Sequence, residues 1–286
     1  MLNNDKRSDA QIQQAVKALF VGLAPERESE LERFWDDFQL QFCLFTDDNG
    51  VMLEGGAYRY VHFNHRALRV IWVSAFAAWE AYAYAQSAFG DGELRDVRRL
   101  EELLALALDI REASDPEAVP LCGLPEPGSL PSDPLLRAPA ELAFFATGWA
   151  MLHEVRHLRH QQEGTSTAEG DSPEIARAEE FSCDRFAAEY LIEKVTDYAQ
   201  AHAANKTTVR MKRALGIYFG VFALIVLAHP NWGQTQSHPS VADRLRAMRD
   251  VLSVNGLDEA LCMVGLSLAG LKQVWPNAPD FLGQPS

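Results

Sequence analysis

The spacing of apolar residues changes from helix-like to strand-like within the first quarter of the chain. Over residues 9–37, apolar side chains recur every three or four positions, which predicts helical structure interrupted near Pro25. In FQLQFCLF, which begins at Phe38, every second residue is apolar, and the turn-like DDNG and a second candidate strand, VMLEGGAYRYVHF, follow it. This order predicts an antiparallel β-hairpin over residues 38–63.

Longer apolar runs predict that most of the remaining chain is helical. Residues 65–88 are rich in alanine and mostly apolar, so we expect a buried helix there, followed by a more amphipathic helix over 93–110. Further helices are expected over about 138–162, 172–203 and 214–228, and from about 239 and 258 onward. The expected fold class is therefore α+β, mainly α-helical, with one small antiparallel sheet.

Prolines gather in the middle of the chain. Seven of the 14 prolines lie between Pro116 and Pro139, which predicts a loop or an extended connector. We therefore expect an N-terminal helical region with the hairpin over 1–115, the connector over 116–139, and a second helical region over 140–286. The two helical regions are expected to form one compact unit.

The uncharged segment ALGIYFGVFALIVLA raises the question of a membrane span. It covers 15 residues, from 214 to 228, whereas a spanning helix needs about 20 apolar residues. We therefore expect a buried core helix and no stable membrane insertion. The polar N-terminus lacks the apolar core of a signal peptide.

Composition narrows the classes of partner and the compartment. The formal net charge of −14 argues against a nucleic-acid-binding protein that works by neutralising phosphates. The four cysteines are scattered and form no CxxC pair, which is typical of free thiols in a reducing compartment. We expect a cytoplasmic protein.

The strongest chemical signal is the HExxH motif in the predicted 138–162 helix. On a helix, His153 and His157 stand about 6 Å apart on one face, so both imidazoles can bind one zinc ion. Catalytic zinc keeps an open position for water, and Glu154 is placed to act as the general base. His160 lies three residues further on and points poorly at the same ion. The motif predicts a Zn²⁺-dependent hydrolase.

A third zinc ligand is expected from the segment AEEFSCDRFAAEY. Glu180 and Asp184 are four residues apart and share one helix face, so Glu180 can bind zinc while Asp184 accepts a hydrogen bond from a ligand histidine. Glu179 and Glu189 are expected to be solvated helix charges. Cys183 is either a thiolate ligand or, more often for a lone cysteine, a small core residue.

Three segments in this order, HEVRH, EEFSCDRFAAEYL and SHPSVADRLRAM, resemble the gluzincin zinc metallopeptidases of the HtpX-like and CAAX-prenyl-protease type. The resemblance implies a zincin-like helical core, with Glu180 as the third zinc ligand and Asp184 as its supporting partner. It also implies that His238 and Arg244 stabilise the oxyanion of the tetrahedral intermediate. From the residues alone, His238 equally fits the start of a helix with Arg244 on its surface.

The overall layout resembles a second group, the Lit-type phage-exclusion metallopeptidases of bacteria. A helical N-terminal half precedes the motif, and the membrane spans of HtpX-like enzymes are not evident. This resemblance implies a selective cytoplasmic enzyme of phage defence. Its substrate would be a folded host protein, and its activity would need a trigger or an activating partner.

The leading hypothesis is a zinc-dependent endopeptidase acting on a protein or peptide. The 38–63 hairpin would offer a strand edge to an extended substrate, and the 116–139 connector would cover the cleft of a triggered enzyme. The alternative is a helical protein-interaction module with a structural or vestigial metal site. Its partner surface would comprise Trp72, Phe76, Trp79, Tyr82 and Tyr84, although aromatic residues at helical spacing are more often core.

Overall fold

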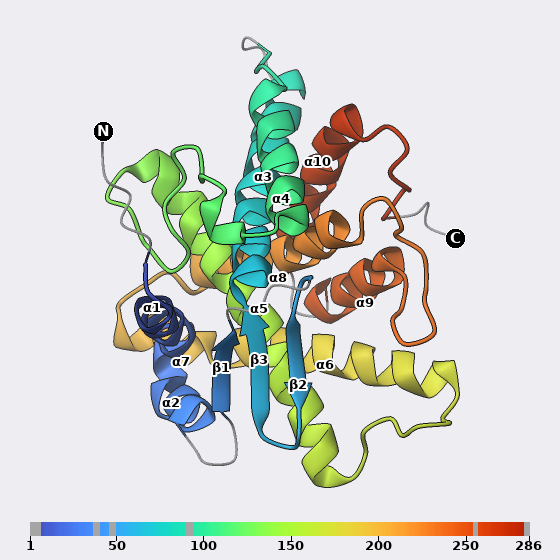
Figure 1. The fold of residues 1–286 in the computed structure, drawn as a ribbon. Helices are drawn as coiled ribbons and strands as arrows, with labels where there is room; N and C mark the ends of the chain where they lie inside the picture. Colours follow the sequence, from blue (N-terminus) through green and yellow to red (C-terminus); the bar gives the residue numbers. More distant parts are fainter. Residues whose placement is uncertain (1–6, 37–40, 46–49, 90–93, 254–256, 283–286) are drawn as a thin grey trace.

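A computed structural model of the chain describes residues 7–36, 41–45, 50–89, 94–253 and 257–282. These ranges are mainly helical and contain one three-stranded sheet (Figure 1), which confirms the predicted fold class. The helices are α1 (Asp9–Val21), α2 (Glu28–Asp36), α3 (His65–Phe89), α4 (Arg98–Glu112), α5 (Pro134–Glu163), α6 (Pro173–Glu193), α7 (Val195–Ala201), α8 (Lys206–Ala228), α9 (Val241–Ser253) and α10 (Asp258–Val274), with short 3₁₀ turns η1 (Pro25–Arg27) and η2 (Pro116–Ala118). The strands are β1 (Gln41–Phe45), β2 (Leu53–Gly56) and β3 (Tyr60–Asn64).

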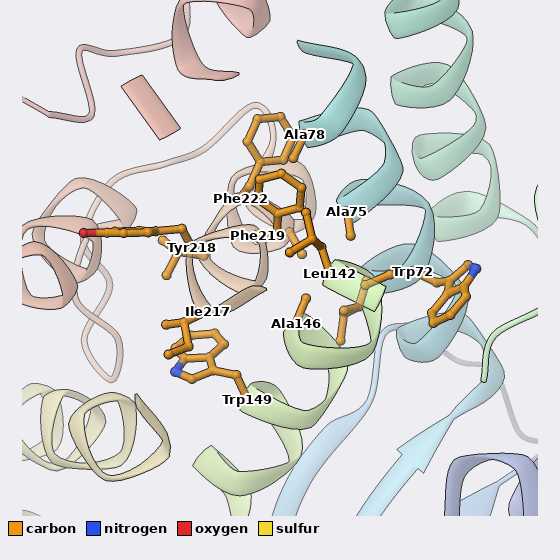
Figure 2. Close-up of a cluster of buried hydrophobic side chains, with 14 of the residues drawn as sticks. Trp72, Ala75, Ala78, Leu142, Ala146, Trp149, Ile217, Tyr218, Phe219 and Phe222 are labelled. Carbon is orange, nitrogen blue, oxygen red and sulfur yellow. The ribbon is translucent and has the colours of Figure 1, made fainter. Parts of the chain in front are cut away.

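Helices α3, α5 and α8 pack together at the centre of the molecule. Figure 2 shows Phe219 and Phe222 of α8 gathered with alanines of α3 and with Leu142 and Ala146 of α5. Helix α8 approaches α5 closely because it carries glycine at the contact: a Cβ atom on Gly220 would lie 2.5 Å from Cε3 of Trp149. The close contact fixes the position of α5, the helix that carries the HExxH motif.

Helix α8 contains the apolar 214–228 segment. Within the described ranges it is the one helix long and apolar enough to cross a membrane, and 72% of its most apolar stretch is buried inside the protein. The expected core helix is thus present, and it is longer than the uncharged segment because it begins at Lys206.

The sheet pairs differently from the predicted antiparallel hairpin. Its strand order is β1-β3-β2, and β1 runs parallel to β3. The antiparallel hairpin instead joins β2 to β3 and turns at Ala57 and Tyr58, whose φ angles are +50° and +65°. The prediction was wrong because it treated 51–63 as one strand, although the segment folds back on itself; the predicted DDNG turn lies mostly outside the described residues.

Two helix boundaries also differ from the prediction. The helix expected over 172–203 is two helices, α6 and α7, which meet at Lys194. The last part of the predicted 116–139 connector already belongs to α5, because Asp133 caps that helix and Pro134 occupies its first turn, where proline is tolerated.

Several residues of the remaining connector are bound to α3. Arg69 donates hydrogen bonds to the carbonyl oxygens of Pro116 and Val119 at 2.7 and 2.6 Å, and the indole of Trp72 donates to Pro125 at 2.8 Å. Trp72 and Phe76 are buried, so these two members of the proposed aromatic surface belong to the core.

Candidate active site

Helix α5 presents its two motif histidines on one face. Leu152, Val155 and Leu158 are fully buried on its other sides, and they fix the rotation of the helix. His153 and His157 follow one another by one turn, and their Nε2 atoms lie 3.1 Å apart. The expected pairing of these imidazoles is present.

Glu180 of α6 completes a group of three candidate ligand residues. Its Oε1 lies 3.2 Å from Nε2 of His157, and its Oε2 lies 3.4 Å from Nε2 of His153. Two ligand atoms about 2.0–2.1 Å from a tetrahedral zinc ion lie about 3.3–3.4 Å apart. The distance between the two Nε2 atoms, and the distance from each Nε2 atom to its nearer Glu180 oxygen, are close to that value. Oε2 of Glu180 is also buried with no hydrogen-bond partner among the described residues, as expected of an atom that binds a metal.

His153 is held from behind by a buried carboxylate. Its Nδ1 lies 2.9 Å from Oδ1 of Asp184, which leaves Nε2 directed at the donor group. Arg244 donates two hydrogen bonds to the same carboxylate, from Nε at 2.8 Å and from Nη2 at 2.6 Å. Burial opposes ionisation of Asp184, but Arg244 and His153 hold its pKa below the ordinary value.

His157 has an equivalent partner that sequence reasoning missed. Glu179 was expected to be a solvated helix charge, but its side chain is only 10% exposed and its Oε1 lies 2.8 Å from Nδ1 of His157. Its Oε2 accepts hydrogen bonds from the backbone N–H and hydroxyl of Thr167. The expectation was wrong because the loop after α5 covers this side of α6.

Glu154 lines the cleft in front of the histidines. Its Oε2 accepts a 2.7 Å hydrogen bond from the backbone N–H of Gly55 in β2. Burial raises the pKa of Glu154 above its ordinary value, while the neighbouring His153 and His157 act in the opposite direction. A Cβ atom on Gly55 would lie 2.8 Å from the carbonyl oxygen of Glu154, so glycine permits this close approach of strand and helix.

His238 and Arg244 both border the cleft but differ in accessibility. The side chain of His238 is 57% exposed, and its Nε2 lies 3.7 Å from Oε1 of Glu180. Arg244 is buried, and its nearest contacts are with Asp184, whereas its Nη1 lies 3.7 Å from Oε2 of Glu180. His238 is therefore accessible to a ligand in the cleft. Arg244, by contrast, mainly holds the carboxylate of Asp184 in place.

Two further residues of the motif segments lie near the histidines. Sγ of Cys183 and ring nitrogens of His153 and His157 all lie within 4.8 Å of one another, so they form a second, wider candidate donor group. Burial and the nearby carboxylates raise the pKa of the Cys183 thiol, which favours its protonated form. His160 is bound to Thr165 and Ser182 through its two ring nitrogens and therefore does not face the donor group.

These side chains open onto a cleft of about 380 Å³. Besides the site residues, its described lining is mostly apolar and comes from α3, α8, α5 and the β2 segment, including Ile71, Leu227, Ala150 and Leu53. None of the described lining residues belongs to 116–139, so the expected cover of the cleft by the connector is not present. The connector instead forms hydrogen bonds with α3 and with Arg7.

A protein-family model described as Peptidase U49 matches residues 61–264, which is more than half of the chain. The chain belongs to the Peptidase U49 family. This membership shows a peptidase, with protein or peptide substrates, and agrees with the Lit-type resemblance of the overall layout. The match contains the candidate site residues from His153 to Arg244 of this U49 peptidase, but it does not establish the HtpX-like or CAAX-prenyl-protease type. No curated protein and no solved structure matches the chain.

Two signals in the U49 peptidase sequence point to the residues that were missed. Glu179 and Glu180 are adjacent carboxylates of α6 that point in different directions, and each reaches a histidine of α5. The pair Gly55-Gly56 inside a candidate strand signals close approach of another backbone, here that of α5.

Proposed function

We propose that this U49 peptidase is a zinc-dependent endopeptidase that cleaves peptide bonds in proteins. The observation that carries the proposal is the convergence of two imidazole nitrogens and one carboxylate at 3.1–3.4 Å, beside a glutamate that lines the same cleft. Two histidines and one glutamate are an established ligand set of catalytic zinc.

His153, His157 and Glu180 would hold the metal. Zinc in such a site supplies Lewis acidity, which makes water a stronger acid near neutral pH and polarises a carbonyl group. Asp184 and Glu179 fix the ring orientations through the Nδ1 atoms, so that both Nε2 atoms stay available.

Glu154 would perform the proton transfers. It takes a proton from the attacking water as the C–O bond forms, and it delivers that proton to the leaving nitrogen as the C–N bond breaks. The Gly55 N–H holds one carboxylate oxygen in place and leaves the other for the water. His238 is exposed at the cleft and would donate a hydrogen bond to the carbonyl oxygen as negative charge develops there.

The edge of β2 would bind the substrate backbone. Asn64 N–H donates to Met52 O, so Met52 faces β3. By the alternation of an antiparallel ladder, Leu53 and Gly55 therefore direct their N–H and C=O groups toward the open edge. An extended peptide would pair beside Leu53, with an apolar side chain in the cleft.

One observation favours a selective or triggered enzyme. Gly55 is already engaged on the open edge, because its N–H donates to Glu154 and its C=O accepts a 3.4 Å hydrogen bond from Gln161. A substrate or an activating partner would have to displace the Gln161 side chain from the Gly55 C=O before pairing beyond Leu53, while the Gly55 N–H stays bound to Glu154. This fits a cytoplasmic phage-defence peptidase that acts on a folded host protein, as the Lit-type resemblance implies.

The decisive test compares the wild-type protein with Glu154→Gln. We expect the variant to bind zinc as the wild type does and to hydrolyse neither casein nor a cellular substrate. Cleavage of casein by the wild type supports an unrestrained enzyme, and cleavage of a cellular target alone supports a selective or triggered one. Equal cellular activity in both proteins would contradict the proposal and favour the interaction module.

A further inference from the structure

The loop between α5 and α6, residues 164–172, is bonded directly to the candidate metal site. Thr167 donates two hydrogen bonds to Oε2 of Glu179, from its backbone N–H at 2.5 Å and from its hydroxyl at 2.7 Å. The other oxygen of the same carboxylate binds Nδ1 of His157 at 2.8 Å. One carboxylate therefore joins the loop to a candidate zinc ligand.

The two histidines are supported in different ways. The carboxylate of Asp184 behind His153 is fully buried and is fixed by the guanidinium of Arg244. Among the described residues, by contrast, the ion pair found for Glu179 is the one with His157. The orientation of the Glu179 carboxylate thus depends on the two hydrogen-bond donors of Thr167, which lies in a loop rather than in a helix.

The start of this loop is fixed by the end of α5. The backbone N–H groups of Thr165 and Ser166 donate to the carbonyl oxygen of His160 at 2.8 and 3.1 Å. The ring of His160 binds the hydroxyl of Thr165 and, across the loop, the hydroxyl of Ser182 in α6. Thr167 follows immediately, so its position over Glu179 is set by an ordered segment.

We propose that Glu179 is a positioning residue for His157 and that it links zinc binding to the order of the 164–172 loop through Thr167. This inference rests on the proposed zinc site. Because linkage is reciprocal, a loop that holds Glu179 strengthens zinc binding, and bound zinc in turn stabilises the loop by the same factor.

The first test measures zinc affinity by competition with a chelator. Partners behind metal-binding histidines typically change metal affinity about 10–100-fold, and we expect Glu179→Gln to weaken zinc binding in that range. Thr167→Val removes the hydroxyl donor but keeps the shape and the backbone N–H, so a smaller loss of about 3–10-fold is expected. Thr167→Ser keeps the hydroxyl and should bind zinc as the wild type does.

Ser166→Ala is the matched control in the same loop, because no hydrogen bond of the Ser166 side chain is found among the described residues. It should leave zinc affinity unchanged. Circular dichroism identifies any variant that fails to fold, and Thr167→Val tests the link even if Glu179→Gln is such a variant.

The second test is hydrogen exchange of 164–172 with and without zinc. Zinc should slow exchange in the wild type, and this protection should shrink in Thr167→Val and Glu179→Gln. If the wild type binds zinc and both folded variants bind it equally well, the inference is overturned while the proposed function stands. If zinc does not alter exchange in the loop, the link is overturned as well. A wild type that binds no zinc overturns both proposals.

Discussion

At the scale of single residues, protons and metal compete for the same nitrogen atoms. Burial opposes the protonation of His153, but its hydrogen bond to Asp184 and the nearby Glu180 carboxylate prevail and raise its pKa to about 10. Burial likewise opposes the protonation of His157, but Glu180 prevails and raises its pKa above the ordinary value. At neutral pH the metal-free site therefore holds a proton on His153 that a metal ion must displace, since zinc binds neutral imidazole.

Zinc affinity should consequently rise with pH. Below the raised pKa of His153 the ring is protonated in the metal-free protein, and this competition disappears only as the pH rises through about 10. Between pH 6 and 9 we expect an increase of about tenfold per pH unit for each proton displaced. Calorimetry in two buffers of different ionisation enthalpy measures the protons released at pH 7; a release of zero would contradict this account.

The Asp184 carboxylate carries a large share of local stability. Asp184→Ala would leave the buried guanidinium of Arg244 without its hydrogen-bonded carboxylate, and breaking a buried pair in this way costs about 3–5 kcal/mol. Chemical denaturation should show this decrease in the free energy of unfolding. Asp250→Ala removes an exposed partner of Arg249 and serves as the control, with a change below about 1 kcal/mol.

At the scale of secondary-structure elements, helix spacing made most of the donor set predictable from sequence. His153 and His157 share a face of α5, and Glu180 and Asp184 share a face of α6, because each pair is four residues apart. The role of Glu179 could not be predicted from helix spacing, because Glu179 and Glu180 point in different directions. Only the path of the 164–172 loop shows that the side of α6 carrying Glu179 is covered. Strand pairing could not be predicted in this way, because the alternation of apolar and polar residues shows which residues are extended but not which strand lies beside them.

The contact between β2 and α5 is the element-scale feature on which catalysis should depend most. Gly55→Ala would place a Cβ atom 2.8 Å from the Glu154 carbonyl oxygen, whereas a Cβ atom on Gly56 meets nothing within 4 Å. We expect Gly55→Ala to displace the strand and lower kcat/KM about 100-fold, since a misplacement of about 1 Å has that effect, while zinc is retained. Gly56→Ala is the control; equal kcat/KM values in the two variants would show that the contact has no role.

At the scale of the whole molecule, the cleft is assembled from distant parts of the chain. Its walls come from β2 and α3 in the N-terminal part and from α5, α8 and the loop that carries His238 in the C-terminal part. Periodicity predicted these helices individually, but it could not predict which faces enclose the cleft. The connector shows the same limit, because the hydrogen bonds of Arg69 and Trp72 that draw it onto α3 are tertiary contacts with no local pattern.

A bulky substitution in the apolar cleft should weaken substrate binding without removing the metal. Ala150 lies one helical turn before Glu154, and both line the cleft. Ala150→Leu adds bulk there and should raise KM or lower kcat/KM about tenfold, with zinc content unchanged. Leu135→Ala, at a position that is 83% exposed, is the control. Unaltered peptide cleavage by Ala150→Leu would show that substrate does not enter this part of the cleft.

The most direct test of the proposed zinc centre is the number of zinc ions bound per chain, measured by elemental analysis. The wild-type protein should bind about one zinc ion. Glu189→Ala, which removes an exposed carboxylate of α6, is the control and should bind the same amount. Glu180→Ala should bind clearly less, because it removes one of three ligands. No bound zinc in the wild type after reconstitution, or equal zinc in all three proteins, would contradict a centre formed by His153, His157 and Glu180.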